Sequence, residues 1–229
     1  MAPQLLAAEW ERGQVLQRPG EHLTWAWFPE TAVVSLRVVL GASKVVEVAT
    51  VGREGFLGQP AVLGDAAATM EAVVQVPGSG LGLPLAVFQA VVGRSGALRQ
   101  LILRATRAFV LQVALGAACN RLHGAEARLA RWLLMTHDRV GADDLRLTHE
   151  FLGEMLGTTR ATATLSAGAL QRAGLVRTGS GRITVVDRAG LEAMACECYQ
   201  AIRAEYERLL GPEAVRSKPQ AGVEPNTLA

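Results

Sequence analysis

The first third of the chain alternates short apolar runs with glycine-containing turns. Val33–Leu40 and Lys44–Val51 are rich in valine and are separated by the Gly-Ala-Ser sequence of residues 41–43, which predicts a β-hairpin. Residues 70–76 form another strand candidate, and we expect residues 77–80, which read Pro-Gly-Ser-Gly, to close it as a turn. Several short strands at close spacing favour a β-sandwich or barrel over βαβ units.

From about residue 85 to residue 123 the apolar spacing becomes helical. Apolar and small residues recur there at three- and four-residue steps and form one stripe along the predicted helix. The stripe is either the contact of the helix with its own domain or the seam of a dimer, and we favour the seam because its small residues would let a second helix approach closely. The stripe consists of Leu98, Leu101, Ile102, Ala105, Phe109, Gln112, Val113 and Gly116.

Residues 148–165 have the pattern of two short helices joined by a tight turn. Thr148 is a good N-cap for the first helix, and Thr159 is one for the second. Gly153 falls where the second helix must approach the first closely, and Gly157 falls where the turn requires a positive φ. This order of helix, glycine-containing turn and helix predicts a helix-turn-helix.

The predicted second helix presents Arg160, Thr162 and Thr164 near its N-terminal end, where recognition helices contact base edges and phosphates. Two β-rich segments follow it, joined by a glycine-rich tip, and they carry Arg177 and Arg182. A basic hairpin directly after a recognition helix predicts a wing. The candidate DNA-contacting residues are Thr148, His149, Thr158, Thr159, Arg160, Thr162, Thr164, Arg177 and Arg182.

The net charge of +2 conceals an asymmetry along the chain. Residues 1–93 contain five Lys/Arg and eight Asp/Glu, whereas residues 94–188 contain fourteen Arg and seven Asp/Glu. Residues 189–229 contain four basic and six acidic residues. Arginine suits forked contacts with phosphates and base edges, so its concentration in the middle block favours a polyanionic partner.

The three cysteines do not suggest a disulfide framework, because their number is odd and two of them are only two residues apart. The Cys196-x-Cys198 spacing is tighter than the usual pair of zinc ligands, and no second pair completes a site, so we expect Cys119, Cys196 and Cys198 to be ordinary thiols and no metal to be bound. Such usage fits a reducing compartment, and with neither a signal peptide nor a membrane span expected, we place the protein in the cytoplasm. No catalytic constellation is evident, so we do not expect an enzyme.

Several stretches resemble the Crp/Fnr family of bacterial transcription regulators. They are residues 147–152, 170–176 and 181–187, together with residues 13–16 and 19–21 nearer the start. The resemblance implies an α+β protein with an N-terminal double-stranded β-helix (jelly-roll) sensor domain over residues 1–92 and a long dimerisation helix over residues 93–124. It also implies a winged helix-turn-helix over residues 125–190, and we expect a C-terminal helix and a disordered tail over residues 191–229, with disorder beyond Gly211.

The resemblance carries over unevenly to the functional positions. Arg160 matches the base-reading arginine of the family, but Ala161 and Leu165 replace a common glutamate and a second arginine, so the operator should differ from the best-known consensus. Residues 66–70 lack the arginine that would bind a cyclic phosphate, so we expect no cyclic nucleotide and leave the effector unknown. The cysteine ligands of an iron–sulfur sensor are too few, and haem binding through His22 or His123 stays open.

The sequence therefore predicts a regulator that binds a pseudo-palindromic site on double-stranded DNA as a homodimer. The resemblance adds RNA polymerase as a further partner and does not suggest a membrane. An alternative is a signalling adaptor that uses the winged helix to bind another protein, because Ala161 and Leu165 leave the recognition helix poor in base-reading groups.

Overall fold

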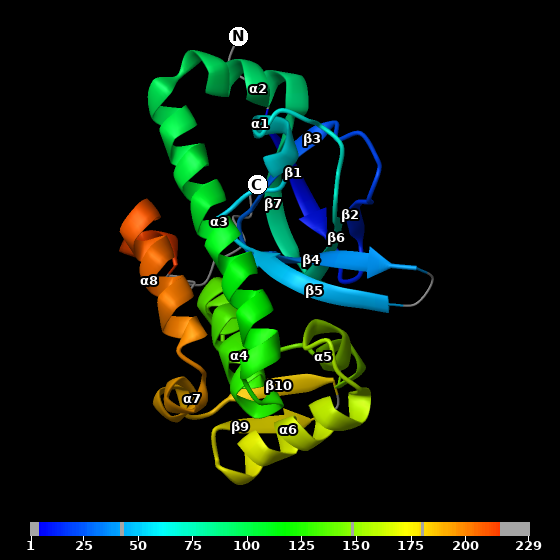
Figure 1. Cartoon of the computed structure of the whole chain (residues 1–229), viewed down its shortest axis with the longest axis vertical. Helices are drawn as coiled ribbons and strands as arrows, with labels where there is room; N and C mark the ends of the chain where they lie inside the picture. Colours follow the sequence, from blue (N-terminus) through cyan, green and yellow to red (C-terminus); the bar gives the residue numbers. More distant parts are fainter. Residues whose placement is uncertain (1–4, 42–43, 148, 180, 216–229) are drawn as a thin grey trace, which may run out of the picture.

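The computed structural model describes residues 5–41, 44–147, 149–179 and 181–215 and shows an α+β protein (Figure 1). Its N-terminal part is a jelly roll made of two antiparallel sheets, with the short helix α1 (Gln59–Val62) between the fifth and sixth strands. One sheet has the order β2 (Val15–Gln17), β6 (Glu71–Val76), β4 (Val33–Leu40) and β5 (Lys44–Val51). The other has the order β1 (Leu6–Trp10), β7 (Gly78–Pro84) and β3 (Trp25–Pro29).

The predicted hairpin is confirmed, since β4 and β5 pair from Val34 opposite Val51 to Leu40 opposite Lys44. The predicted turn over residues 77–80 is wrong, because β7 begins at Gly78 directly after β6.

The glycines of β7 explain this error. A Cβ atom on Gly80 would lie 2.3 Å from the ring of Trp10, and one on Gly82 would lie 2.3 Å from the ring of Trp27. The two tryptophans, which are distant in the sequence, pack against β7 so closely that these positions have no room for a side chain. Local pattern alone cannot distinguish such glycines from those of a turn.

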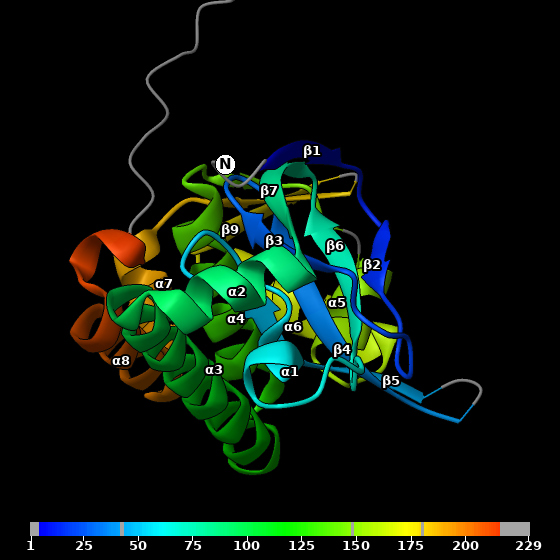
Figure 2. The same cartoon turned by 90° about the horizontal axis from the view of Figure 1, so that it is seen from above.

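The predicted helical region consists of two helices, α2 (Leu85–Arg94) and α3 (Gly96–Leu122). They are separated at Ser95, whose Oγ accepts a hydrogen bond of 3.2 Å from the amide of Leu98 and so caps α3. Seen from above, α3 runs past the barrel, and α8 (Cys198–Leu210) lies along its other side (Figure 2). By length and composition α3 is also apolar enough to cross a membrane, and only 28% of its most apolar window is buried.

The apolar stripe of α3 packs mainly on the protein's own chain, so our preference for it as a dimer seam is wrong. Ile102 and Ala105 are buried against the jelly roll and α2, and Gln112 donates a hydrogen bond of 3.0 Å to the carbonyl of Thr50 in β5. A second face of α3 is exposed instead. It includes Leu103, Val110, Ala114 and Ala117, of which Val110 is 59% exposed.

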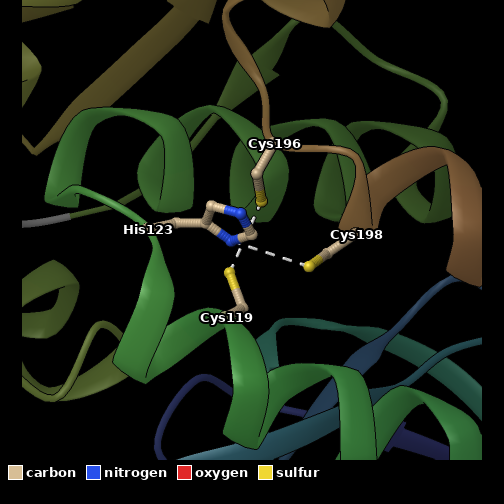
Figure 3. Close-up of side chains that lie close together, drawn as sticks. All are labelled: Cys119, His123, Cys196 and Cys198. Atoms are coloured by element: carbon tan, nitrogen blue, oxygen red, sulfur yellow. Dashed lines mark hydrogen bonds between the residues drawn. The ribbon is translucent and has the colours of Figure 1, made fainter.

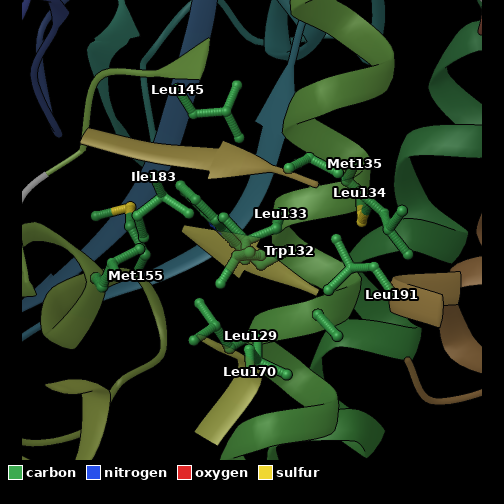
Figure 4. Close-up of a cluster of buried hydrophobic side chains, with 14 of the residues drawn as sticks. Leu129, Trp132, Leu133, Leu134, Met135, Leu145, Met155, Leu170, Ile183 and Leu191 are labelled. Atoms are coloured by element: carbon green, nitrogen blue, oxygen red, sulfur yellow. The ribbon is translucent and has the colours of Figure 1, made fainter. Parts of the chain in front are cut away.

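The C-terminal part is a separate core of helices and a three-stranded sheet (Figure 4). Leu129 and Leu133 of its first helix pack there with Leu170, Ile183 and other buried side chains. The elements are α4 (Ala125–Val140), β8 (Asp144–Leu145), α5 (His149–Met155), α6 (Arg160–Arg172), β9 (Val176–Gly179), β10 (Arg182–Val185), α7 (Arg188–Met194) and α8.

The chain beyond Gly211 was expected to be disordered, but Pro212–Ala214 form a 3-10 helix. Arg53 in the N-terminal part donates a hydrogen bond of 2.6 Å to the carbonyl of Glu213 in this helix. Residues 216–229 lie outside the described residues.

Candidate nucleic-acid interface

The turn between α5 and α6 has the geometry that the two glycines predicted. Gly157 has a φ of +58°, in the left-handed region, and the amide of Thr158 bonds back to the carbonyl of Gly153 at 2.9 Å. A Cβ atom on Gly153 would lie 3.2 Å from the amide nitrogen of Arg160. The two helices therefore cross closely at Gly153, and this contact fixes the direction in which α6 leaves the turn.

Thr159 acts as the N-cap of α6, as predicted for a helix start. Its Oγ1 accepts a hydrogen bond of 3.1 Å from the amide of Thr162 and lies 3.0 Å from the Thr162 hydroxyl. The structure thus gives Thr159 a capping role, while the backbone amides at this helix end retain the partial positive charge that favours a phosphate.

One face of α6 is open to solvent along its first two turns. Arg160 and Thr164 are exposed and lie one turn apart, beside Ala161 and Leu165. Leu165 is 70% exposed, which is unusual for a leucine in the middle of a short helix. The opposite face carries Ala163 and other buried residues that pack on the C-terminal core. The helix therefore presents a small, mixed polar and apolar surface that fits the major groove of DNA.

The end of α6 directs the chain into the wing. Gly174 has a φ of +75°, its amide bonds to the carbonyl of Gln171 at 2.9 Å, and the amide of Leu175 bonds to the carbonyl of Leu170 at 3.0 Å. These two bonds form a Schellman motif, which ends α6 at a glycine in the left-handed conformation.

Strands β9 and β10 then pair as the predicted hairpin, with Val176 opposite Val185. Arg177 is exposed on this wing. Arg182 is also exposed, and its guanidinium lies 3.4 Å from Asp144, which in turn accepts a hydrogen bond of 2.6 Å from the hydroxyl of Thr184. An exposed ion pair of this kind is weak, so a phosphate could replace Asp144 as the partner of Arg182.

The predicted contact residues whose side chains the structure describes therefore lie together on α6, the preceding turn and the wing. Two predicted residues are not described in this way. Thr148 lies outside the described residues, and for His149 only the backbone, which begins α5, is described. Thr158 is half-buried in the turn before α6.

A set of polar contacts holds this domain against the jelly roll. Trp132 of α4 donates a hydrogen bond of 2.8 Å to Glu47 of β5. Arg139 of α4 is buried and lies 2.8 Å from Glu54, and its guanidinium also donates to Gln112 of α3 at 3.2 Å. The orientation of the helix-turn-helix is thus linked to the jelly roll through buried groups.

Glu47 is the most perturbed carboxyl group of this contact. Burial raises its pKa to about 7, although hydrogen bonds from Ser35 and Trp132 act in the opposite direction. Its Oε2 atom has no hydrogen-bond partner among the described residues. The carboxyl therefore keeps its proton to a higher pH than an exposed glutamate does.

Three phenylalanine rings pack together in the interior of the jelly roll. Phe28, Phe56 and Phe88 pack with ring centroids 5.7–6.1 Å apart. Gln59, the first residue of α1, is buried, and its side-chain amide donates a hydrogen bond to the carbonyl of Phe56. A cavity of about 300 Å³ lies among α1, α2 and α3, where Gln89 and Arg99 are the polar lining residues.

The structure also brings together four residues that the sequence did not connect. Cys119 and His123, at the end of α3, lie beside Cys196 and Cys198 at the start of α8 (Figure 3). The signal was present as a Cys-x₃-His sequence, but His123 and the nearer cysteine of the other pair, Cys196, are 73 positions apart. A hydrogen bond from the thiol of Cys196 lowers the pKa of Cys119 to about 5, and the same contact raises the pKa of Cys196.

The fold and the exposed helix define a winged helix-turn-helix protein with an N-terminal jelly roll. Residues 127–194 match the family model of the Crp-like helix-turn-helix domain. The chain is 36% identical over 76 residues to the transcriptional regulator SdrP of Thermus thermophilus, in an alignment that covers 33% of this chain and 37% of that protein.

Two solved structures extend the likeness in fold to both domains. The regulator TTHB099 of Thermus thermophilus has a TM-score of 0.69 and 20% identity, over 82% of this chain and 96% of its own. FixK2 of Bradyrhizobium japonicum has a TM-score of 0.72 and 15% identity, over 84% of this chain and 98% of its own. This protein therefore carries the Crp-like helix-turn-helix domain and the fold of Crp/Fnr-family regulators, as the resemblance implied.

Proposed function

We propose that the protein is a transcription regulator that binds a specific DNA sequence as a dimer. The observation that carries the proposal is the open face of α6 within a Crp-like helix-turn-helix domain, flanked by a wing with Arg177 and Arg182. The dependence of such contacts on arginine and on helix N-termini makes the binding strongly sensitive to salt.

The base-reading roles follow from the chemistry of the exposed face. Arg160 donates a forked pair of hydrogen bonds to guanine, and Leu165 contacts a thymine methyl group. Thr164, Thr162 and the amides at the N-terminus of α6 contact phosphates and set the register. The side chains of Arg177 and Arg182 on the wing contact the flanking backbone.

The dimer is proposed from the exposed face of α3. Leu103, Val110 and Ala117 are spaced by seven residues and lie on the side of α3 that the protein's own chain leaves open. Pairing this face with the same face of a second copy covers the apolar surface, and it places two recognition helices on half-sites about one helical turn apart. The seam of the dimer thus differs from the stripe that the sequence favoured.

The N-terminal jelly roll is proposed to sense an effector other than a cyclic nucleotide, or to serve as a scaffold only. Residues 66–70 carry no charge, so the phosphate of a cyclic nucleotide would lack the arginine that binds it in the family. Contact with RNA polymerase and a place in the cytoplasm are parts of the same proposal.

Binding of a fluorescent mixture of random duplex DNA at two salt concentrations tests this function. We expect retention that falls steeply as salt rises, and a loss of several-fold in affinity for Arg160→Ala. Arg94→Ala, which removes the same charge from an exposed position on α2, serves as the control and should change little. The second candidate, a protein-binding adaptor supported by Ala161 and Leu165 on α6, predicts no retention at either salt concentration.

A further inference from the structure

The four residues Cys119, His123, Cys196 and Cys198 have the composition and closeness of a metal site. Their ligand atoms, three sulfurs and one ring nitrogen, all lie within 4.8 Å of one another. The Sγ atoms of Cys119 and Cys196 are 3.4 Å apart, and the Sγ of Cys198 is 3.7 Å from Nδ1 of His123. Figure 3 shows the four side chains converging on one point between the end of α3 and the start of α8.

These distances fit one tetrahedral zinc ion. With Zn–S bonds of about 2.3 Å and a Zn–N bond of about 2.0 Å, tetrahedral ligands lie about 3.8 Å apart for two sulfurs and about 3.5 Å apart for sulfur and nitrogen. Small rotations of the side chains would bring the longer separations into this range. An iron–sulfur cluster needs a wider set of ligands, because the ligands are divided among two or more irons and must surround the inorganic sulfides as well.

The surroundings of His123 give a second, independent indication. Its Nδ1 faces the thiols, while its Nε2 lies 3.2 Å from Oε1 of Glu197. A carboxylate that accepts a hydrogen bond from the second nitrogen of a metal-binding histidine fixes the tautomer and the ring direction. By accepting a hydrogen bond from the proton on Nε2, Glu197 favours the tautomer in which the lone pair of Nδ1 is directed toward the sulfurs.

The charges around the cluster suit three thiolates. A zinc ion with three thiolates and a neutral histidine has a net charge of −1. Arg128 and Arg131 of α4 lie close enough to the thiols to interact with them electrostatically. All three cysteines are buried, with Cys119 0% exposed, so a bound ion would be shielded from competing ligands.

We propose that Cys119, His123, Cys196 and Cys198 bind one zinc ion, which joins the end of α3 to the connection between α7 and α8. Zinc is chosen because three thiolates and one imidazole in a closed, four-coordinate arrangement are typical of structural zinc sites. The ion fastens the long helix to the helices that follow the wing, across 77 residues of sequence. The proposal does not depend on DNA binding.

The first test uses the full-length protein, purified under reducing conditions and analysed for metals by mass spectrometry. We expect one zinc per chain. After removal of the metal with a chelator, titration with cobalt should give the absorption of a tetrahedral cobalt–thiolate centre at one equivalent, and zinc should abolish that absorption. Failure of cobalt to produce this absorption in a folded protein with three free thiols would overturn the proposal, as would several irons per chain or a Cys119–Cys196 disulfide in place of the metal.

Variants separate the ligands from their surroundings. His123→Ala and Cys198→Ser should lose the cobalt absorption, and His123→Ala spares the buried thiols, so circular dichroism should show an intact fold. Glu197→Gln should keep the spectrum but bind zinc about 10- to 100-fold more weakly, as expected for a residue that orients a ligand. His22→Ala, an exposed histidine in the N-terminal domain, is the control and should bind one equivalent normally. Full cobalt binding by His123→Ala and Cys198→Ser would contradict the proposed ligand set.

Discussion

At the scale of single residues, the contact between the two domains includes a buried carboxyl group, Glu47, whose pKa differs between the folded and the unfolded chain. Glu47 is enclosed by Trp132 of α4 and by its own sheet, and burial raises its pKa to about 7. In the unfolded chain the same carboxyl titrates near its ordinary value of 4.5. The native state therefore holds the proton of Glu47 over a pH range in which the unfolded chain has lost it.

This difference makes stability depend on pH with a definite sign. Between about pH 4.5 and pH 7 the native state binds more protons, so the free energy of unfolding should fall as the pH rises, by on the order of 3 kcal/mol for this group. Chemical denaturation at pH 5 and pH 8 measures the change.

Replacing Glu47 by Gln keeps the acceptor for Trp132 and removes the ionisation. We expect Glu47→Gln to be more stable than the parent protein at pH 8 and to lose most of the pH dependence over this range. Glu30→Gln, at an exposed position, is the control. A pH dependence that is unchanged in Glu47→Gln would show that another group causes it.

At the scale of elements, the helix-turn-helix could be predicted because its determinants are local. Thr159, Gly157 and Gly174 act within a few residues of where they stand, as a cap, a turn and a helix end. The glycines of β7 and the four-residue cluster could not be predicted in this way. Their meaning depends on Trp10 and Trp27 in one case, and in the other on the packing of α3 against α8.

The close crossing of α5 and α6 can be tested by replacing two glycines by alanine, one that faces backbone atoms and one that faces a flexible side chain. Gly153→Ala brings Cβ to 3.2 Å from backbone atoms of Thr158 and Arg160, so we expect a loss of about 1 kcal/mol in stability despite the better helix propensity of Ala. Gly168→Ala meets only the flexible end of Arg172, at 3.4 Å, and should stabilise the protein by up to about 1 kcal/mol. Thermal denaturation compares them, and equal shifts in the same direction would contradict the crossing.

At the scale of the whole molecule, the open face of α3 exposes apolar residues that nothing within a single chain covers among the described residues. Much of this long apolar helix is exposed even though it packs on the barrel and on α8. From the sequence we predicted a dimer seam on this helix, but we assigned it to the stripe that packs on the protein's own jelly roll. Periodicity identifies an apolar face of a helix, but it does not show whether the same chain or a second copy covers that face.

A charge on the open face should separate the proposed dimer. We expect Val110→Glu to convert the protein from dimer to monomer and to weaken DNA binding more than ten-fold, because both half-sites must then be bound independently. Leu63→Glu, at an exposed apolar position outside α3, is the control. Light scattering after size exclusion measures the mass, and a monomeric parent protein would contradict the assignment of this face.

Sequencing of the duplex DNA that the protein enriches from random fragments, for the parent chain and for Arg160→Ala, tests most directly whether α6 reads DNA. We expect one motif with two inverted half-sites about one helical turn apart, and a preference for guanine in each half that Arg160→Ala weakens while the other positions persist. Enrichment without any common motif, or a motif that Arg160→Ala leaves unchanged, would contradict the claim that α6 reads the sequence.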